Sequence, residues 1–254
     1  METVQDWHPI HESNSLSNPM YARSSKFPTP SPVQSKFLSG RSMAPPPFQL
    51  KSDGEKGAEK CRRKDKGTNK GNKGYSEHKH KSVIVTIPEG SAKSYPILMI
   101  YGGLRYATRE WMMKQIPSSY FKSHILVFAN WGSTYASKAG PHHKEVLKRE
   151  CVSGTYKGLI GFSKGGNPVA RGKNDESWGN IGLIDPEITG YTKGFSTNVY
   201  MVWNTWGGKS EKVDARARFH RKIKAGKEPG DSVRLKISHA DMVSAFFSKY
   251  GSNF

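Results

Sequence analysis

Short, unbroken apolar segments are the feature that most constrains the fold of this 254-residue chain. Pro96–Tyr101 (PILMIY) and His124–Asn130 (HILVFAN) lack the alternation of polar and apolar residues that is typical of a strand with one face in water. Continuous apolar runs of this length indicate strands buried on both faces, as in a parallel sheet covered by helices on each side. Both runs are far too short to span a bilayer.

Similar segments recur after residue 81 and alternate with helical patterns, which is typical of α/β folds. Seven strands are expected, at 82–87, 96–101, 124–130, 156–162, 180–184, 198–203 and 232–237. Helices are expected at 108–115, 141–150, 211–224 and 240–250, and another just after residue 165. The sequence therefore predicts one α/β domain over residues 81–254, with a mostly parallel sheet, helices on both faces and no large lid.

Residues 1–80 differ in composition from the rest of the chain. Their first half is rich in Ser, Pro and Asn, and the part from Lys51 onward consists mainly of Lys, Gly and Glu. Such a segment cannot bury enough apolar surface to offset its ordering entropy, so we expect a disordered tail, or one that orders only on a partner. The first residues lack a basic region followed by an apolar run, so no secretory signal is expected. We therefore expect the protein to be synthesised in the cytoplasm.

The chain is strongly basic, with a net charge of +19. Residues 1–80 contribute 14 basic minus 8 acidic residues, or +6, and residues 81–254 contribute 26 minus 13, or +13. Since both parts are basic, an anionic partner or surface is expected, with simple solubility as the alternative. Cys61 and Cys151 are too few for a disulfide framework and are expected to be free thiols; neither has metal-ligand spacing, and no metal site is predicted.

The strongest candidate for chemistry is the segment Gly161-Phe-Ser163-Lys-Gly165, between a buried strand and a helical pattern. G-x-S-x-G at such a junction is typical of a serine nucleophile held on a tight, strained turn. Glycine on either side lets the strand and the helix approach closely. Pro168 predicts that the following helix is distorted or begins late. A purely structural glycine turn is the alternative.

Residues 82–254 resemble the α/β-hydrolase fold of serine hydrolases such as lipases and esterases. The resemblance rests on the GFSKGG segment, on the Tyr101-Gly-Gly-Leu104 turn, and on an isolated histidine after the last expected strand. It implies a triad in the chain order serine, acid, histidine, and no cofactor. Ser163 would be the nucleophile and His239 the general base, a role that suits imidazole because its ordinary pKa lies near neutrality.

The resemblance also implies an oxyanion hole made of two backbone N–H groups. One would belong to Lys164, directly after the nucleophile, and the other to Gly103 or Leu104. The remaining histidines on expected helices are interpreted as surface residues; these are His142, His143 and His220.

The acid of the triad is expected to be Asp185, at the carboxyl end of the fifth expected strand, where α/β sheets place their sites. Members of the family more often carry the acid after the next strand. This chain has Asn204 there, which cannot act as a carboxylate. Glu211 and Asp214 remain the alternatives to Asp185.

The tail carries a second resemblance. The region from Ser17 to Leu50, and Pro45–Lys51 (PPPFQLK) in particular, resembles leader segments of toxins loaded into bacterial contractile injection systems. This implies synthesis in a bacterial cytoplasm, an injection-apparatus tube lumen or a chaperone as partner, and delivery into a target cell.

The function expected from these observations is that of a lipase-, esterase- or phospholipase-like hydrolase acting on an acyl ester or lipid substrate. The alternative is a basic nucleic-acid-binding or structural cargo protein on a degenerate hydrolase scaffold. Against nucleic-acid binding, the sequence lacks RNP-like, zinc-finger and helix-turn-helix signatures.

Overall fold

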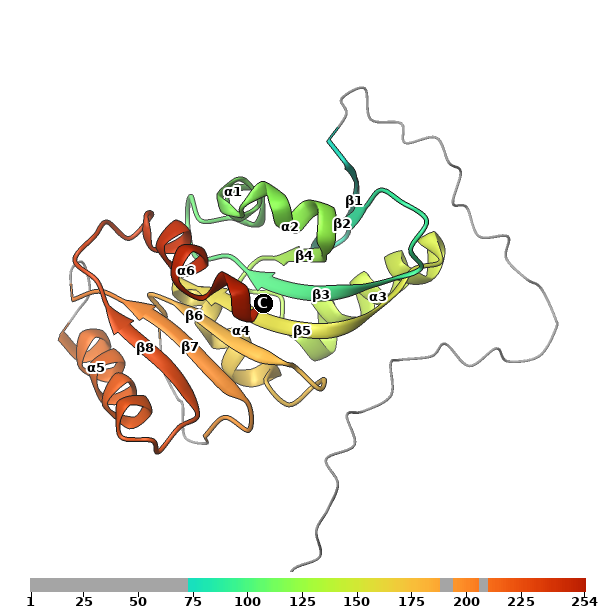
Figure 1. The fold of residues 1–254 in the computed structure, drawn as a ribbon. Coiled ribbons are helices and arrows are strands. Elements are labelled where there is room, and N and C mark those ends of the chain that lie inside the picture. The colour runs from blue at the N-terminus through green and yellow to red at the C-terminus, as the bar shows by residue number, and fades with distance from the viewer. Residues whose placement is uncertain (1–72, 188–193, 206–209) are drawn as a thin grey trace, which may run out of the picture. The chain divides into compact units, whose positions relative to one another are not determined.

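The computed structural model describes residues 73–187, 194–205 and 210–254, which build an eight-stranded sheet (Figure 1). The strand order is β1-β2-β4-β3-β5-β6-β7-β8. β1 and β2 are antiparallel to their neighbours, and the other strands run parallel. The strands are Tyr75–His80 (β1), Val83–Pro88 (β2), Ser94–Tyr101 (β3), Ile125–Ala129 (β4), Ser153–Phe162 (β5), Asn180–Ile184 (β6), Asn198–Trp203 (β7) and Gly230–Arg234 (β8).

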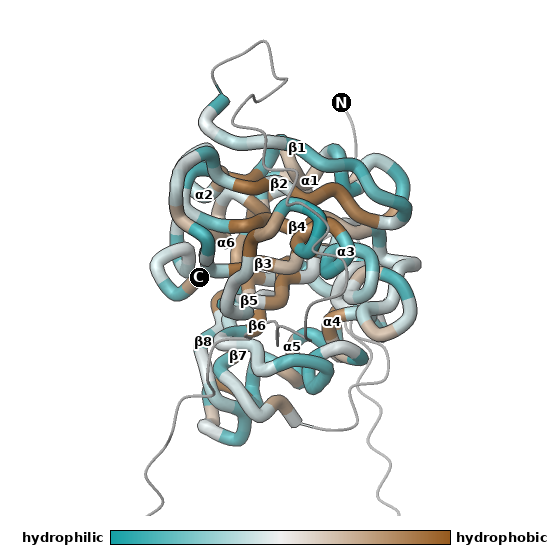
Figure 2. Tube along the Cα trace, turned by 90° about the vertical axis from the view of Figure 1, so that its right-hand side faces the viewer, coloured by the Kyte–Doolittle hydropathy of each residue, from teal (hydrophilic) through white to brown (hydrophobic). Residues whose placement is uncertain are grey.

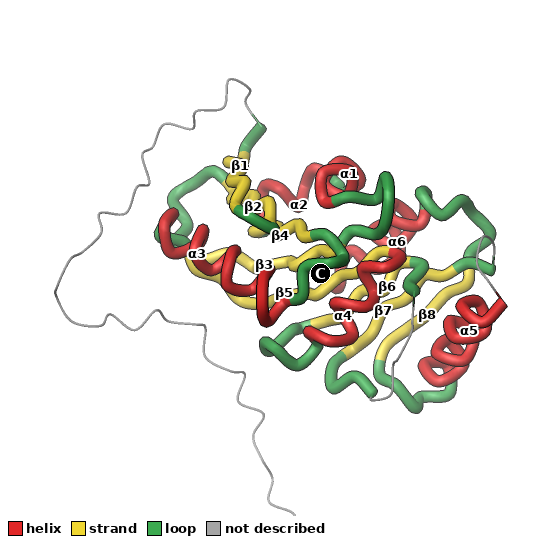
Figure 3. The backbone as a smooth tube through the Cα atoms, turned by 180° about the vertical axis from the view of Figure 1, so that it is seen from behind, coloured by secondary structure: helices red, strands yellow, loops and turns green. Residues whose placement is uncertain are grey.

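Helices cover both faces of the sheet (Figures 1 and 3). α1, α2 and α6 pack on one face, and α3, α4 and α5 pack on the other. A π-helical turn, Tyr135–Ala139, leads into α3, and short 3-10 turns occur at Ser163–Gly165 and Gly251–Asn253. The helices are Arg109–Gln115 (α1), Ser118–Ser123 (α2), Gly140–Glu150 (α3), Gly166–Gly172 (α4), Ser210–Lys224 (α5) and Met242–Tyr250 (α6).

The central strands form the hydrophobic layer between the helices, as the brown colour of the tube shows (Figure 2). Every residue of Ile125–Ala129 is buried, as expected of a strand covered on both faces. The predicted α/β class and mostly parallel sheet are therefore confirmed. Within the described residues, no insertion large enough to form a lid occurs between β5 and β7, and no helix combines the length and apolarity needed to cross a membrane.

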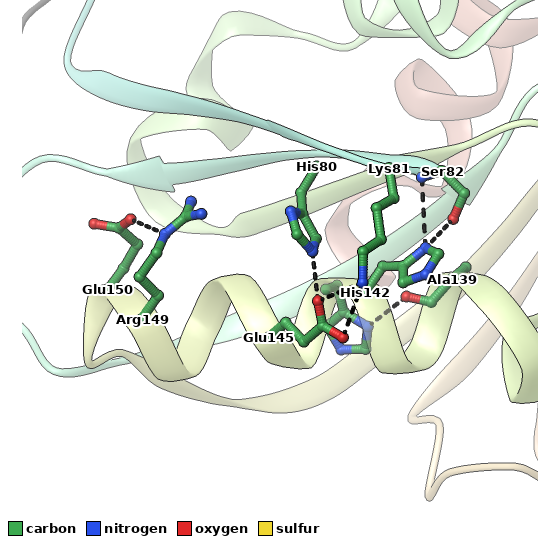
Figure 4. A network of polar contacts seen from close by, with 9 residues as sticks. His80, Lys81, Ser82, Ala139, His142, Glu145, Arg149 and Glu150 are labelled. Carbon is green, nitrogen blue, oxygen red and sulfur yellow. Dashed lines mark hydrogen bonds and ion pairs between the residues drawn. The ribbon is translucent and has the colours of Figure 1, made fainter. Parts of the chain in front are cut away.

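Residues 75–80 differ from the prediction, because they form β1 although the disordered tail was expected to reach residue 80. β1 pairs with β2 along its whole length, from Tyr75 opposite Pro88 to His80 opposite Val83. Figure 4 shows how the end of this hairpin contacts α3: the Glu145 carboxylate lies 2.5 Å from His80 Nε2 and accepts a hydrogen bond from Lys81. Residues 1–72 of the expected tail, including the leader-like segment, lie outside the described residues.

His143 was expected at the surface, and this prediction is wrong. Its side chain is fully buried, with Nδ1 3.0 Å from the Ala139 carbonyl oxygen and Nε2 3.2 Å from the Tyr156 hydroxyl. Burial disfavours the imidazolium and lowers the pKa of His143 to about 4. His142 and His220 are half-buried, so they also lie deeper than expected.

Three smaller features were not anticipated. α2 is a six-residue helix after Pro117, too short to give a helical pattern. β8 begins two residues earlier and ends three residues earlier than the expected strand 232–237. Cys151 is disulfide-bonded, so the prediction of a free thiol is wrong at this position, and Cys61 lies outside the described residues.

Candidate active site

Ser163 occupies a sharp turn between β5 and α4. Its φ is 53°, a left-handed conformation that is unfavourable for a residue with a side chain. A Cβ on Gly161 would clash with the Gly165 carbonyl, and one on Gly165 would clash with the Tyr101 carbonyl. The two glycines of the motif are thus needed where the turn folds back on β5 and β3.

The helix after this turn begins late, as Pro168 predicted. Residues 163–165 form a 3-10 turn, and α4 starts at Gly166. Pro168 is the third residue of α4, where a backbone N–H would have no acceptor within the helix, so the proline costs no hydrogen bond there. The carbonyl of Ser163 accepts a hydrogen bond from the Glu187 N–H at 2.8 Å, which ties the turn to the segment after β6.

Asp185 follows β6 and is almost completely buried, with 2% of its side chain exposed. Its Oδ2 lies 2.5 Å from Nδ1 of His239. Its Oδ1 accepts a hydrogen bond from the Asn204 N–H at 3.0 Å and forms an ion pair with Nη1 of Arg216 at 2.8 Å. A carboxylate this deeply buried needs such partners to remain charged.

His239 comes from the loop between β8 and α6 and lies beside the serine turn. Its ring stacks on that of Phe162, the residue before Ser163, with ring centres 4.5 Å apart and 28° between the planes. The side-chain amide of Asn204 donates to the carbonyl of Ile237 and so fixes the loop that carries the histidine. With Nδ1 directed at Asp185, Nε2 is the nitrogen left for the serine.

The Ser163 hydroxyl makes no hydrogen bond within the part of the chain that the structure describes. Contacts between a nucleophile and its base are often long in a site without substrate and shorten in the Michaelis complex. Asp185 and His239 are therefore in direct contact. The turn that carries Ser163 lies next to them because its neighbour Phe162 stacks on the His239 ring.

Arg216 was not among the predicted site residues, although it links the segments on either side of the site. From α5, its Nε donates to the Pro186 carbonyl at 2.7 Å and its Nη1 to the Asn204 carbonyl at 3.3 Å. Burial lowers the pKa of the guanidinium, and the negative charge of Asp185 opposes that shift. A signal existed in the sequence: Arg216 lies three residues after Val213 on the apolar stripe of a helix whose other basic residues mostly face water.

The other two candidate acids lie elsewhere. Glu211 and Asp214 are exposed on α5, and the described contacts of His239 include neither of them. Of the three carboxylates considered, the structure brings only Asp185 to the imidazole.

The segment expected to supply the oxyanion hole packs against the nucleophile. A Cβ on Gly103 would lie 3.0 Å from the Cβ of Ser163, so the backbone after β3 passes directly over the serine. A turn closed by the Ala107 N–H and the Leu104 carbonyl at 3.2 Å follows. The backbone of Gly103 therefore lies beside Ser163, as does that of Lys164, the next residue along the chain.

Comparison with solved structures finds the same architecture in several hydrolases. A protein from Lactobacillus plantarum assigned as a carboxylesterase aligns over 71% of this chain and 98% of its own, with 12% identity and a TM-score of 0.50. An acylaminoacyl peptidase from Pyrococcus horikoshii aligns over 70% of this chain and 41% of its own, with 9% identity and a TM-score of 0.50. The chain has the α/β-hydrolase fold.

FphF, a fluorophosphonate-binding serine hydrolase of Staphylococcus aureus, aligns with 11% identity over 67% of this chain and 91% of its own, with a TM-score of 0.47. No protein-family profile matches the sequence, and a search of curated proteins found no match. Because the identities are so low, the likeness defines the fold, and the chemistry has to be argued from the residues of this chain.

Proposed function

We propose that this chain is a serine hydrolase that cleaves acyl esters, with Ser163 as nucleophile, His239 as general base and Asp185 as the acid. The observation that carries the proposal is the contact between the buried Asp185 carboxylate and the half-buried His239 imidazole, next to a serine held at positive φ. A carboxylesterase and a peptidase are among the proteins that share the fold, which supports acyl transfer as the class of reaction.

In the proposed reaction the Ser163 oxygen attacks the substrate carbonyl while Nε2 of His239 takes the hydroxyl proton. Asp185 holds the imidazole through Nδ1 and stabilises the imidazolium that forms. The backbone N–H groups of Lys164 and of Gly103 or Leu104 bind the oxyanion, and each such donor lowers the barrier by about 3 kcal/mol. The imidazolium then protonates the leaving alcohol, and water, deprotonated by the same histidine, releases the acid and regenerates the serine.

Labelling by a fluorophosphonate probe tests the nucleophile. We expect the full chain to be labelled covalently and the Ser163→Ala variant to remain unlabelled, because the probe reacts only with an activated serine. Ser244→Ala, at an exposed position on α6, is the matched control and is expected to label like the parent chain. Undiminished labelling of Ser163→Ala would overturn the assignment.

Replacing the acid tests the second position. Asp185→Asn is expected to lower kcat on a p-nitrophenyl ester by about 10⁴-fold, because the amide no longer favours the tautomer in which Nε2 accepts a proton. Glu211→Gln and Asp214→Asn serve as controls and are expected to keep kcat within about twofold, since exposed carboxylates remote from the imidazole contribute little to it. A larger loss in either control than in Asp185→Asn would reassign the acid.

Delivery by a contractile injection system remains a proposal from the sequence, because the leader-like segment lies outside the described residues. A reporter protein carrying residues 1–72 at its N-terminus is expected to co-purify with assembled injection particles. The same reporter without that segment should not, and equal recovery of both would contradict the proposal.

A further inference from the structure

The described residues expose three large hydrophobic side chains, Leu104, Tyr106 and Trp131, with 36%, 53% and 39% of their surface accessible. Leu104 and Tyr106 follow β3, and Trp131 follows β4. Since these strands run parallel to β5, all three side chains lie at the same edge of the sheet as Ser163. Single exposed hydrophobic residues need no explanation, but their concentration at one site does.

The two aromatic side chains of this set, Tyr106 and Trp131, are connected to the candidate active site by ring contacts and a cation–π contact. The ring of Tyr106 packs edge-on against Trp111, with centroids 5.5 Å apart, and Trp111 stacks on Phe162 at 5.4 Å. On the other side, Nζ of Lys164 lies 5.1 Å from the centre of the Trp131 ring. The exposed apolar surface therefore flanks the nucleophile on two sides.

The backbone holds the first of these segments firmly, so its exposed side chains are not the result of a loose loop. A Cβ on Gly102 would clash with the Ala107 carbonyl, so the loop closes tightly on itself after β3. Arg105 has a left-handed φ of 56°, and residues 104–106 are all exposed at the top of the turn. A rigid loop that keeps apolar groups in water lowers the entropic cost of covering them with a ligand.

Two basic side chains belong to this surface. Arg105 is exposed at the tip of the turn and Lys164 is half-buried beside the nucleophile. The nearby carboxylate of Glu110 is paired with Nε of Arg109 at 2.8 Å. Tyr and Trp favour the boundary between water and hydrocarbon, and Lys and Arg favour anionic headgroups, so the combination fits the surface of an anionic bilayer.

We propose that these five residues, Leu104, Arg105, Tyr106, Trp131 and Lys164, form a membrane-binding rim around Ser163, and that the substrate is an acyl ester of a lipid in an anionic bilayer. This proposal rests on the proposed hydrolase function and narrows its substrate class. The rim would bury its aromatic rings at headgroup depth and so present the ester carbonyl of a lipid to the serine without a lid.

Co-sedimentation with lipid vesicles tests the rim. The full chain is incubated with phosphatidylcholine vesicles that either contain or lack phosphatidylglycerol. We expect binding to the anionic vesicles, and at least a tenfold weaker partition for the double variant Tyr106→Ser, Trp131→Ser, because the apolar contact area is lost. Tyr95→Ser, a half-buried tyrosine at the opposite end of β3, is the matched control and should bind like the parent.

The basic N-terminal part of the chain can itself bind anionic lipid, so only differences between variants of the full chain are interpreted. Arg105→Gln is expected to weaken binding to anionic vesicles by about fivefold, and Lys148→Gln, on the exposed part of α3, should not. Equal partition of the double variant and the parent chain would overturn the proposal.

Two further measurements separate this proposal from the hydrolase function. Ser163→Ala is expected to bind vesicles like the parent while losing fluorophosphonate labelling. The Tyr106→Ser, Trp131→Ser variant is expected to retain labelling while losing most of its activity on vesicle phospholipid. Vesicle binding by the rim without any labelling of Ser163 would reject the proposed hydrolase function and support the membrane-binding surface. Labelling of Ser163 without a contribution of the rim to binding would support the hydrolase function and reject the membrane-binding surface.

Discussion

At the scale of single residues, Asp185 is unusual because its carboxylate lies between two basic side chains. One oxygen faces His239, and the other forms an ion pair with Arg216 and accepts a hydrogen bond from the backbone of Asn204. The guanidinium holds the carboxylate in place, but its positive charge also reduces the stabilisation that the carboxylate can give to an imidazolium formed during the proposed reaction. Arg216 is thus a positioning residue for the candidate acid.

The Arg216→Met variant tests this positioning role. Asp185 would lose its guanidinium partner, and the Pro186 and Asn204 carbonyls would lose their donor, so kcat on a p-nitrophenyl ester is expected to fall by about 10-fold to 100-fold with little change in KM. Arg216→Lys keeps the charge and should retain more of the activity. The Met variant should also lose about 3 kcal/mol of unfolding free energy in urea, because a buried carboxylate loses a partner. An unchanged kcat in the Met variant would leave Arg216 a purely structural role.

The candidate acid could be selected from the sequence by its place after a strand, but its arginine partner could not. Strand ends are marked by composition, so Asp185 and Ser163 could both be placed at one edge of the sheet. The contact with Arg216 depends on the angle at which α5 packs on the sheet, and a sequence pattern does not encode that angle. His143 was misplaced for a related reason: its buried side chain is satisfied by the Ala139 carbonyl, one helical turn earlier, and by the Tyr156 hydroxyl on β5, and the second contact depends on how α3 packs on the sheet.

At the scale of elements, the turn between β5 and α4 requires glycine at positions where a side chain would clash with neighbouring backbone. Gly165→Ala is expected to destabilise the protein by about 3 kcal/mol or more and to abolish fluorophosphonate labelling, because its Cβ would collide with the carbonyl groups of Tyr101 and Gly102. Gly132→Ala is the matched control, since a Cβ there has no neighbour within 4 Å. Normal stability and labelling of the Gly165 variant would show that the turn can widen without loss.

The packing of α3 predicts how stability depends on pH. Unfolded chains bind a proton at His143 below the ordinary pKa of about 6.5, whereas the folded protein resists protonation until about pH 4. The unfolded state therefore binds more protons between these values, and stability should fall by about 3 kcal/mol as the pH drops from 6.5 to 4. Urea unfolding of His143→Gln across this range is expected to show a correspondingly smaller loss; an equal loss in both proteins would contradict the assignment.

At the scale of the whole molecule, the strands buried on both faces and their alternation with helices were enough to predict the α/β class and most element positions. The edge strand β1 could not be predicted. β1 contains only one large apolar residue, Tyr75, and it folds because β2 offers an unpaired edge and α3 offers partners for its histidines. The composition of residues 75–80 predicts neither the pairing with β2 nor the contacts with α3.

Truncation tests where the folded part begins. A chain that starts at residue 73 is expected to unfold at a temperature roughly 3 °C or more above that of a chain that starts at residue 81. The shorter chain loses the β1–β2 pairing and the contact of Tyr75 with Phe121. Both should label with the probe, since β1 lies at the edge of the sheet remote from Ser163. Equal melting temperatures would mean that β1 adds nothing to stability.

The positions of the three candidate catalytic groups along the chain have a consequence for fragments of this protein. Ser163 and Asp185 both come from the middle of the sequence, whereas His239 follows β8, the last parallel strand. A polypeptide cut anywhere between residues 186 and 238, if the pieces separate, would keep an attacking group and a counter-charge with nothing to carry the proton. Molecules that have lost the C-terminal piece should therefore be inert, and hydrolytic activity would report on protein that retains both pieces.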